Sequence, residues 1–161
     1  MATVIEGRES GFKTNPDYKI ALEPSLRRVR VQFNGEWVAD STNARLLFET
    51  RHLPVYYFPR SDVRLDLMRP TEHHTFCPYK GKARYWSAKI GDQSFPDIVW
   101  SYPDPIPECP KIRGYLCFFN EQVDAILVDG VEVPRPVTPW SKDWQEKAAS
   151  VPDTRGPVAR P

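Results

Sequence analysis

Residues 29–39 read VRVQFNGEWVA, and this stretch decides the fold class. Apolar residues at positions 29, 31 and 33 alternate with polar ones, which is the two-residue period of a strand with one buried face. The dipeptide Asn34-Gly35 is typical of a type I′ turn, because both turn positions need a positive φ. The apolar residues after the turn complete a predicted β-hairpin.

Similar short signals continue along the chain. Further strands are predicted at residues 55–58, 63–67, 82–90, 98–102, 112–119, 123–128 and 131–133, with a turn at Gly91-Asp92. Residues 44–49 fit either a short helical turn or a strand over residues 45–49. The chain has 17 prolines and 8 glycines, which disfavours long helices because an interior proline breaks a helix. We therefore expect an all-β, mainly antiparallel domain of about eight short strands over residues 27–136.

The two ends of the chain differ from this central region. Residues 1–26 lack a clear period and are predicted to form an extension that lies over the domain, with one short element near residues 18–22. The tail, residues 137–161, carries Trp140, Trp144 and Ala148 at a helical spacing. A short helix at about residues 140–149 is therefore expected to pack against the domain.

Charge balance and apolar runs argue against several classes of partner. Lys plus Arg number 22 and Asp plus Glu 21, and the resulting net charge of +1 argues against binding nucleic acid or an anionic membrane. The apolar runs are far shorter than the roughly 20 residues that cross a bilayer. Residues 1–10 contain Glu6, Arg8 and Glu9 and lack the apolar stretch of a signal peptide, so we expect a cytoplasmic protein. Exposed sheet edges leave a homodimer open as an alternative to a monomer.

Three cysteines, Cys77, Cys109 and Cys117, form an odd set without a CxxC pair, which favours free thiols over disulfides or structural zinc. Cys77 follows His73 and His74 by four and three residues, so an imidazole could activate its thiolate as a nucleophile. A cysteine that only packs is the commoner case. Metal binding by these three side chains is the weakest interpretation, because adjacent histidines on a strand point to opposite faces.

Three groups of residues resemble a known protein family. They are Pro-Val-Tyr-Tyr-Phe-Pro at residues 54–59, Cys-Pro-Tyr-Lys-Gly at residues 77–81 with Ala83, Tyr85, Trp86 and Ser87, and Trp-Ser-Tyr-Pro-Asp-Pro at residues 100–105. With Glu49, His52, Gly114, Asp124 and Ala125, they make residues 29–136 similar to the domain of unknown function 427 family. The resemblance implies a compact β-tent-like architecture and carries a nucleotidyltransferase label. The sequence has no glycine-rich phosphate cradle and no adjacent pair of metal-binding carboxylates that would support this label.

The same motifs gather titratable and aromatic residues suited to an enclosed organic ligand. His52 and Glu49 are the predicted proton donor and acceptor, because a carboxylate can orient an imidazole; a histidine that only bonds a loop carbonyl is the alternative. Lys80, before Gly81, is predicted to aim its ammonium at a ligand oxygen, or else to be a solvated turn lysine. Tyr57 is predicted to donate a hydrogen bond to a developing oxyanion.

The predicted substrate-binding residues are Cys77, Tyr85, Trp100, Tyr102 and Asp62. Ordinary sheet packing is the alternative for the aromatic side chains, and a surface ion pair with Arg60 is the alternative for Asp62. We expect a small enzyme that performs acid–base chemistry on an organic metabolite without a cofactor, by cyclisation, isomerisation, dehydration or hydrolysis. The alternatives are a non-catalytic module that binds a small molecule or peptide, and the nucleotidyltransferase of the family label.

Overall fold

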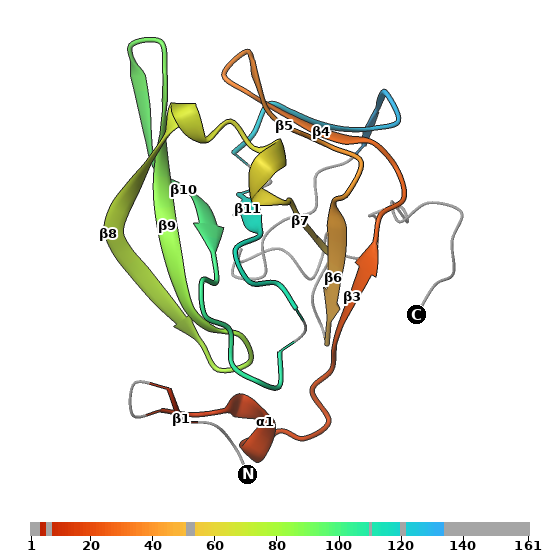
Figure 1. Cartoon of the computed structure of the whole chain (residues 1–161), viewed down its shortest axis with the longest axis vertical. Coiled ribbons are helices and arrows are strands. Elements are labelled where there is room, and N and C mark those ends of the chain that lie inside the picture. Colours follow the sequence, from red (N-terminus) through yellow and green to blue (C-terminus); the bar gives the residue numbers. More distant parts are fainter. Residues whose placement is uncertain (1–3, 6–7, 51–53, 110, 120–121, 134–161) are drawn as a thin grey trace.

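Figure 1 shows the computed structural model of the chain, which describes residues 4–5, 8–50, 54–109, 111–119 and 122–133. Antiparallel sheets contain most of these residues, so the predicted all-β class is confirmed. The helices in the described part of the chain are short: α1 (Gly11–Thr14) and the 3₁₀ turns η1 (Arg60–Asp62) and η2 (Leu65–Leu67). No helix among these residues is long and apolar enough to cross a membrane.

The strands form three sheets and one small pair. The first sheet has the order β3 (Ile20–Pro24), β6 (Arg45–Glu49), β7 (Val55–Tyr57). The second has the order β11 (Leu116–Phe118), β10 (Gln93–Ser101), β9 (Gly81–Ile90), β8 (Met68–Cys77). The third has the order β13 (Val131–Val133), β12 (Ala125–Val128), β4 (Val29–Phe33), β5 (Glu36–Ser41). The pair consists of β1 (Val4–Ile5) and β2 (Arg8–Glu9).

The predicted hairpin is β4 and β5. Its turn residues Asn34 and Gly35 have φ values of 47° and 81°, as a type I′ turn requires. The predicted hairpin around Gly91 is also present, as β9 and β10. The ambiguous segment at residues 44–49 is a strand, β6, which pairs with β3 and β7.

A backbone bridge joins the first and second sheets. The Phe58 amide donates to the Leu116 carbonyl at 2.9 Å, and the Leu116 amide donates to the Phe58 carbonyl at 2.8 Å. In Figure 1 the second sheet stands on one side, the first sheet on the other, and β4 and β5 lie across one end. The first and second sheets are therefore joined where β7 meets β11.

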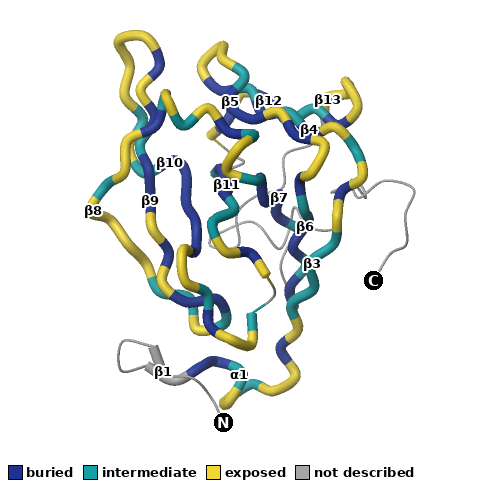
Figure 2. The backbone as a smooth tube through the Cα atoms, in the orientation of Figure 1, coloured by how far each residue is buried: buried dark blue, intermediate teal, exposed yellow. Residues whose placement is uncertain are grey.

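Strands of the joined sheets are buried on both faces. Leu46 and Tyr56 belong to a first cluster, which also contains the inner residues of β4, β5 and β12. Their chain neighbours Leu47 and Tyr57 point the opposite way and belong to a second cluster. Figure 2 shows the resulting continuous burial along β7, β11 and the last four residues of β10. Runs of consecutive apolar residues in this sequence thus reflect two cores rather than one.

The strand predicted over residues 63–67 is wrong, because this segment contains the turn η2. Arg64 donates two hydrogen bonds of 2.8 Å to the carboxylate of Asp66, a pairing that residues two apart reach in a tight turn. The Leu67 amide donates to the Arg64 carbonyl at 3.0 Å, which closes the turn. The alternation of apolar residues at positions 63, 65 and 67 therefore does not reflect a strand.

Strand β8 is the main element that the pattern missed. It is an edge strand whose residues are mostly exposed, as Figure 2 shows, so it has no alternation of apolar and polar residues. The predicted strand at residues 112–119 is reduced to β11, because the Tyr115 amide donates to the Ile112 carbonyl at 3.0 Å in a turn. Part of the predicted extension, β3, belongs to the first sheet. The helix expected at residues 140–149 lies outside the described residues.

Candidate functional site

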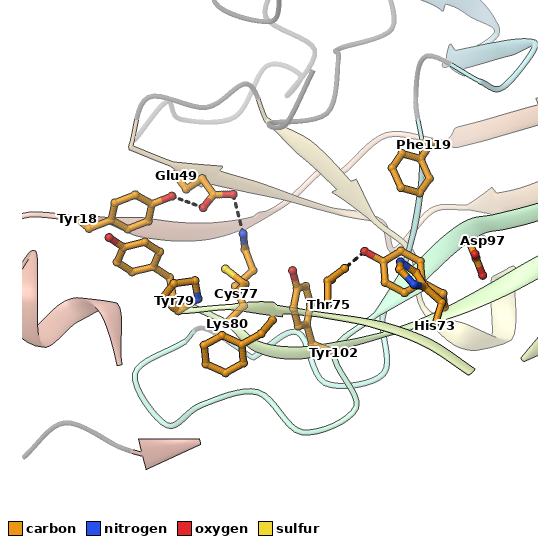
Figure 3. A pocket seen from close by; sticks show the side chains of 13 residues that line it. Tyr18, Glu49, His73, Thr75, Cys77, Tyr79, Lys80, Asp97, Tyr102 and Phe119 are labelled. Carbon is orange, nitrogen blue, oxygen red and sulfur yellow. Dashed lines mark hydrogen bonds and ion pairs between the residues drawn. The ribbon is translucent and has the colours of Figure 1, made fainter. Parts of the chain in front are cut away.

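A cavity of about 660 Å³ lies between the second sheet and one end of the first sheet. Its walls come from β8, the turn after it, β9, β10 and the ends of β6 and β11. The lining residues are Tyr18, Glu49, His73, Thr75, Phe76, Cys77, Pro78, Tyr79, Lys80, Tyr85, Asp97, Tyr102 and Phe119. Figure 3 shows a charged group at one end of this cavity and an aromatic group at the other.

Glu49 and Lys80 form a buried ion pair in the wall of the cavity. Lys80 Nζ lies 2.7 Å from Glu49 Oε1, and the two side chains are only 8% and 3% exposed. Glu49 is the last residue of β6, and Lys80 lies in the turn between β8 and β9. The Lys80 carbonyl accepts a hydrogen bond of 2.9 Å from the Ile106 amide, which anchors this turn. The fold thus brings together two charges that are 31 positions apart in the chain.

Tyr18 completes the charged group. Its hydroxyl donates a hydrogen bond to Oε2 of Glu49, so the two carboxylate oxygens accept from different partners. The Tyr18 ring stacks on Tyr79, with 3.7 Å between ring centres and 8° between planes. Tyr79 in turn contacts Phe12 of α1 edge to face. The segment before β3 therefore closes this end of the cavity with aromatic rings.

Lys80 and Tyr18 both keep their protons at neutral pH. Burial alone lowers the pKa of Lys80, but its electrostatic interactions with Cys77 and Glu49 and its hydrogen bond to Glu49 raise it more, so the pKa of Lys80 lies above its ordinary value. Burial and the hydrogen bond to Glu49 raise the pKa of Tyr18. Burial likewise raises the pKa of Tyr102, whose ring centre lies 6.0 Å from Lys80 Nζ. Lys80 is thus a fixed cation that can donate hydrogen bonds to a ligand oxygen.

Polar groups also stand at the aromatic end of the cavity. The hydroxyls of Thr75 and Tyr85 lie 2.9 Å apart, and the His73 ring is 4.5 Å from the Tyr85 ring. Asp97 is half-buried and accepts a hydrogen bond of 2.7 Å from Thr71. Burial raises the pKa of Tyr85, and the charge of Asp97 raises it further, while the bond to Thr75 lowers it. Asp97 is therefore close enough to influence this end electrostatically.

Five of the predicted site residues line the cavity, namely Glu49, Lys80, Cys77, Tyr85 and Tyr102. Three others lie elsewhere. Tyr57 is buried behind the cavity wall, where burial raises its pKa and it contacts Cys117, and Trp100 packs on Phe119 with 4.9 Å between ring centres. Asp62 lies in η1 and accepts a hydrogen bond of 2.6 Å from Ser41.

His52, the predicted proton donor, lies outside the described residues. The structure also bears on the alternatives for Cys77. His73 and Cys77 both line the cavity, but Figure 3 places the imidazole near Asp97 and the thiol near the Glu49–Lys80 pair, so the imidazole does not contact the thiol. No group of three His, Cys, Asp or Glu side chains that could hold a metal ion occurs in the part of the chain that the structure describes.

Several lining residues were not predicted. Tyr18 lies in a segment without periodicity, directly before β3. Only the pairing of β3 with β6 brings it beside Glu49. Tyr79 stands between Pro78 and Lys80 in a predicted motif, and that neighbourhood was the signal that could have found it. Asp97 enters the cavity through a bulge in β10 that no local pattern marks.

The comparison with protein families gives a match. The family described as Domain of unknown function (DUF427) matches residues 21–129. No curated protein matches the sequence. The matched region contains the Glu49–Lys80 pair and Asp97, whereas Tyr18 precedes it. Because the match covers more than half of the residues of this chain, the chain belongs to the DUF427 family.

Proposed function

We propose that this protein is an enzyme that binds a small organic carbonyl compound in the cavity and moves a proton next to the carbonyl group. One observation carries the proposal: a carboxylate and an ammonium group, both buried, stand side by side in the wall of an aromatic cavity. Removal of a proton from carbon needs a base and a nearby group that stabilises the negative oxygen. Glu49 and Lys80 match these two roles.

In the proposed reaction, Glu49 takes the proton from the carbon next to the carbonyl group. The electrons of the C–H bond form a carbon–carbon double bond, and the carbonyl π electrons move onto oxygen. The Lys80 ammonium group donates a hydrogen bond to this enolate oxygen. Glu49 then returns the proton to carbon as the carbonyl bond forms again. Atoms and charge balance, and no other reactant is needed.

The environment of the pair suits these roles. Among the described residues, Glu49 is the only side chain that accepts a hydrogen bond from Lys80 Nζ, which leaves N–H donors for a ligand oxygen. A carboxylate has about four lone-pair sites, so bonds from Lys80 and Tyr18 leave room for a proton from carbon. The rings of Tyr18, Tyr79 and Tyr102 reduce access of water and strengthen these interactions.

A binding module without catalysis is the second candidate, because it also uses fixed hydrogen-bond donors in the cavity. The pKa values of Lys80, Tyr18 and Tyr102 are all raised, so none of these groups exchanges its proton readily near neutral pH. In a binding module, the Glu49–Lys80 pair would orient a ligand, and the ligand would be released chemically unchanged. Nucleotidyl transfer, the third function considered, is tested by titration with a nucleoside triphosphate and magnesium.

Deuterium exchange distinguishes an enzyme from a binding module. Phenylpyruvate combines an aromatic ring with exchangeable protons next to a carbonyl group, and proton NMR in D₂O follows their replacement. We expect the protein to accelerate exchange, and Glu49→Gln to reduce the acceleration at least about 100-fold, as for loss of a general base. The matched control is Asp66→Asn, an exposed acid-to-amide change outside the cavity. Saturable binding without acceleration would identify a binding module.

A further inference from the structure

Asp97 occupies an unusual backbone position for a residue that lines a cavity. It has a φ of 52° within β10, a backbone conformation that residues other than glycine rarely adopt. Three residues, 96–98, stand opposite the single residue Ser87 at this point of the sheet. The Ser87 hydroxyl accepts a hydrogen bond of 3.0 Å from the Asp97 amide and holds the bulge in place. Such bulges redirect side chains and are frequent beside functional sites.

A second bulge lies on the other side of β9. Residues 71–73 of β8 stand opposite the single residue Tyr85. The Thr71 hydroxyl of this bulge donates to Asp97 Oδ1 at 2.7 Å and also accepts from the His73 amide at 3.3 Å. The two bulges therefore fix each other across the sheet. Together they turn Asp97 and His73 towards the same end of the cavity.

The acceptor capacity of Asp97 is only partly used. Within the described residues, Thr71 is the one side chain that donates to its carboxylate, and it bonds Oδ1. An ionised carboxylate only accepts hydrogen bonds. A ligand group that meets Asp97 favourably must therefore be a donor. Figure 3 places this carboxylate far from the Glu49–Lys80 pair, beyond Thr75 and His73.

We infer that the ligand of this cavity has two polar ends: a carbonyl oxygen at Lys80 and a hydroxyl or amine donor at Asp97, joined by an aromatic or conjugated body. This inference rests on the proposed function, because it places the carbonyl group at the Glu49–Lys80 pair. The Tyr85 and Phe119 rings stack on each other at the aromatic end of the cavity and match a flat body.

The test compares two probes that differ only in the donor, para-hydroxyphenylpyruvate and para-fluorophenylpyruvate. Isothermal titration measures their dissociation constants with the whole chain. We expect the hydroxyl compound to bind about tenfold more tightly, because a hydrogen bond to a charged group is among the stronger kinds. Asp97→Gly suits the positive φ, removes the carboxylate and should abolish the preference. Asp97→Asn also tolerates this φ and should reduce it.

Asp92→Asn is the matched control, because Asp92 is an exposed acid in the turn between β9 and β10, and it should keep the preference. Equal affinities for the two probes, no binding of either, or a preference that survives Asp97→Gly would overturn the inference. Deuterium exchange separates this result from the proposed function. A preference for the hydroxyl compound without exchange supports the inference and rejects the enzyme. Deuterium exchange without a preference for the hydroxyl compound supports the enzyme and rejects the inference.

Discussion

The two hydrophobic clusters use opposite faces of the same strands, and they differ in chemistry. The first cluster packs β6, β7, β10 and β11 against the third sheet, and its members are nearly all hydrocarbon. The second cluster contains hydroxyls and thiols, among them Tyr57, Tyr102 and Cys117, and it adjoins the cavity. Neighbouring residues of one strand thus serve different purposes. Position within the two-residue period, rather than position in the chain, separates stability from ligand binding.

The largest effect should come from Lys80, at the polar edge of the second cluster. Lys80→Met leaves the Glu49 carboxylate buried with Tyr18 as its donor, and removal of one partner of a buried pair costs about 3–5 kcal/mol of unfolding free energy. Urea denaturation measures the loss. The double variant Lys80→Met/Glu49→Leu should recover most of it, because it removes the unpaired charge.

An exposed pair provides the control for this prediction. Arg64 and Asp66 are bonded at 2.8 Å, but their side chains are 49% and 62% exposed. Asp66→Asn should leave the unfolding midpoint unchanged, because water screens the pair. If Lys80→Met also left the unfolding midpoint unchanged, the Glu49–Lys80 pair would contribute no more to stability than an exposed ion pair does.

Leu46 and Leu47 allow the two clusters to be compared at adjacent positions. Both side chains are almost completely buried, so either change to alanine should cost about 2–5 kcal/mol by urea denaturation. Leu46→Ala should keep the affinity for phenylpyruvate, because Leu46 faces the first cluster. Leu47→Ala should also weaken that affinity, because Leu47 supports Tyr57 and Tyr102 behind the cavity. Equal affinities in the two variants would contradict the division between faces.

The sequence predicted the first cluster better than the second. Val29, Val31 and Phe33 alternate within one hairpin, so a local period is enough to find their buried face. The second cluster and its cavity depend on contacts between distant segments, such as Tyr18 with Glu49 and Glu49 with Lys80. No local period encodes such contacts.

Individual site residues illustrate the same limit. Lys80, Cys77 and Tyr85 were found because they belong to compact motifs. Tyr57 and Trp100 belong to equally compact motifs and to the same cluster as Tyr85 and Tyr102, but they pack inside that cluster instead of lining the cavity. Asp97 requires two facing bulges, and bulges leave no clear trace in the amino-acid pattern.

The packing of α1 onto the cavity can be tested at Gly11. A Cβ atom at this position would lie 2.6 Å from Cε1 of Tyr79 and 2.9 Å from Cβ of Pro78, well inside normal contact. Gly11→Ala should therefore cost about 1–3 kcal/mol and weaken phenylpyruvate binding, because Tyr79 must move away from Tyr18. Alanine favours a helix over glycine, so a loss of stability can only reflect the contact with Pro78 and Tyr79.

Urea denaturation and titration of phenylpyruvate measure the two effects of Gly11→Ala. Asp17→Ala is the control, because Asp17 is an exposed residue of the same segment. A Gly11→Ala protein with unchanged affinity would show that α1 does not hold the Tyr18–Tyr79 stack in place.

The smallest expected effect is a loss of folding stability at alkaline pH. The buried thiols of the second cluster should cause this loss. Burial raises the pKa of Cys109 from 9.0 to about 12 and the pKa of Cys117 above its ordinary value. Below pH 9 the folded and unfolded chains both hold these protons, and the full stability is present. Above pH 9 the unfolded chain releases thiol protons that the folded chain retains, so stability falls as pH rises towards the folded values.

Urea midpoints measured from pH 7 to pH 10 should therefore be constant up to about pH 8.5 and then decline. The decline for each proton stays below about 1.4 kcal/mol per pH unit. Cys117→Ala should make the decline shallower, because it removes one of the buried thiols. Leu46→Ala should lower every midpoint but preserve the slope, because it changes the first cluster alone. If Leu46→Ala also changed the slope, the alkaline response would belong to the whole fold, and the chemical difference between the two faces would have no consequence for stability.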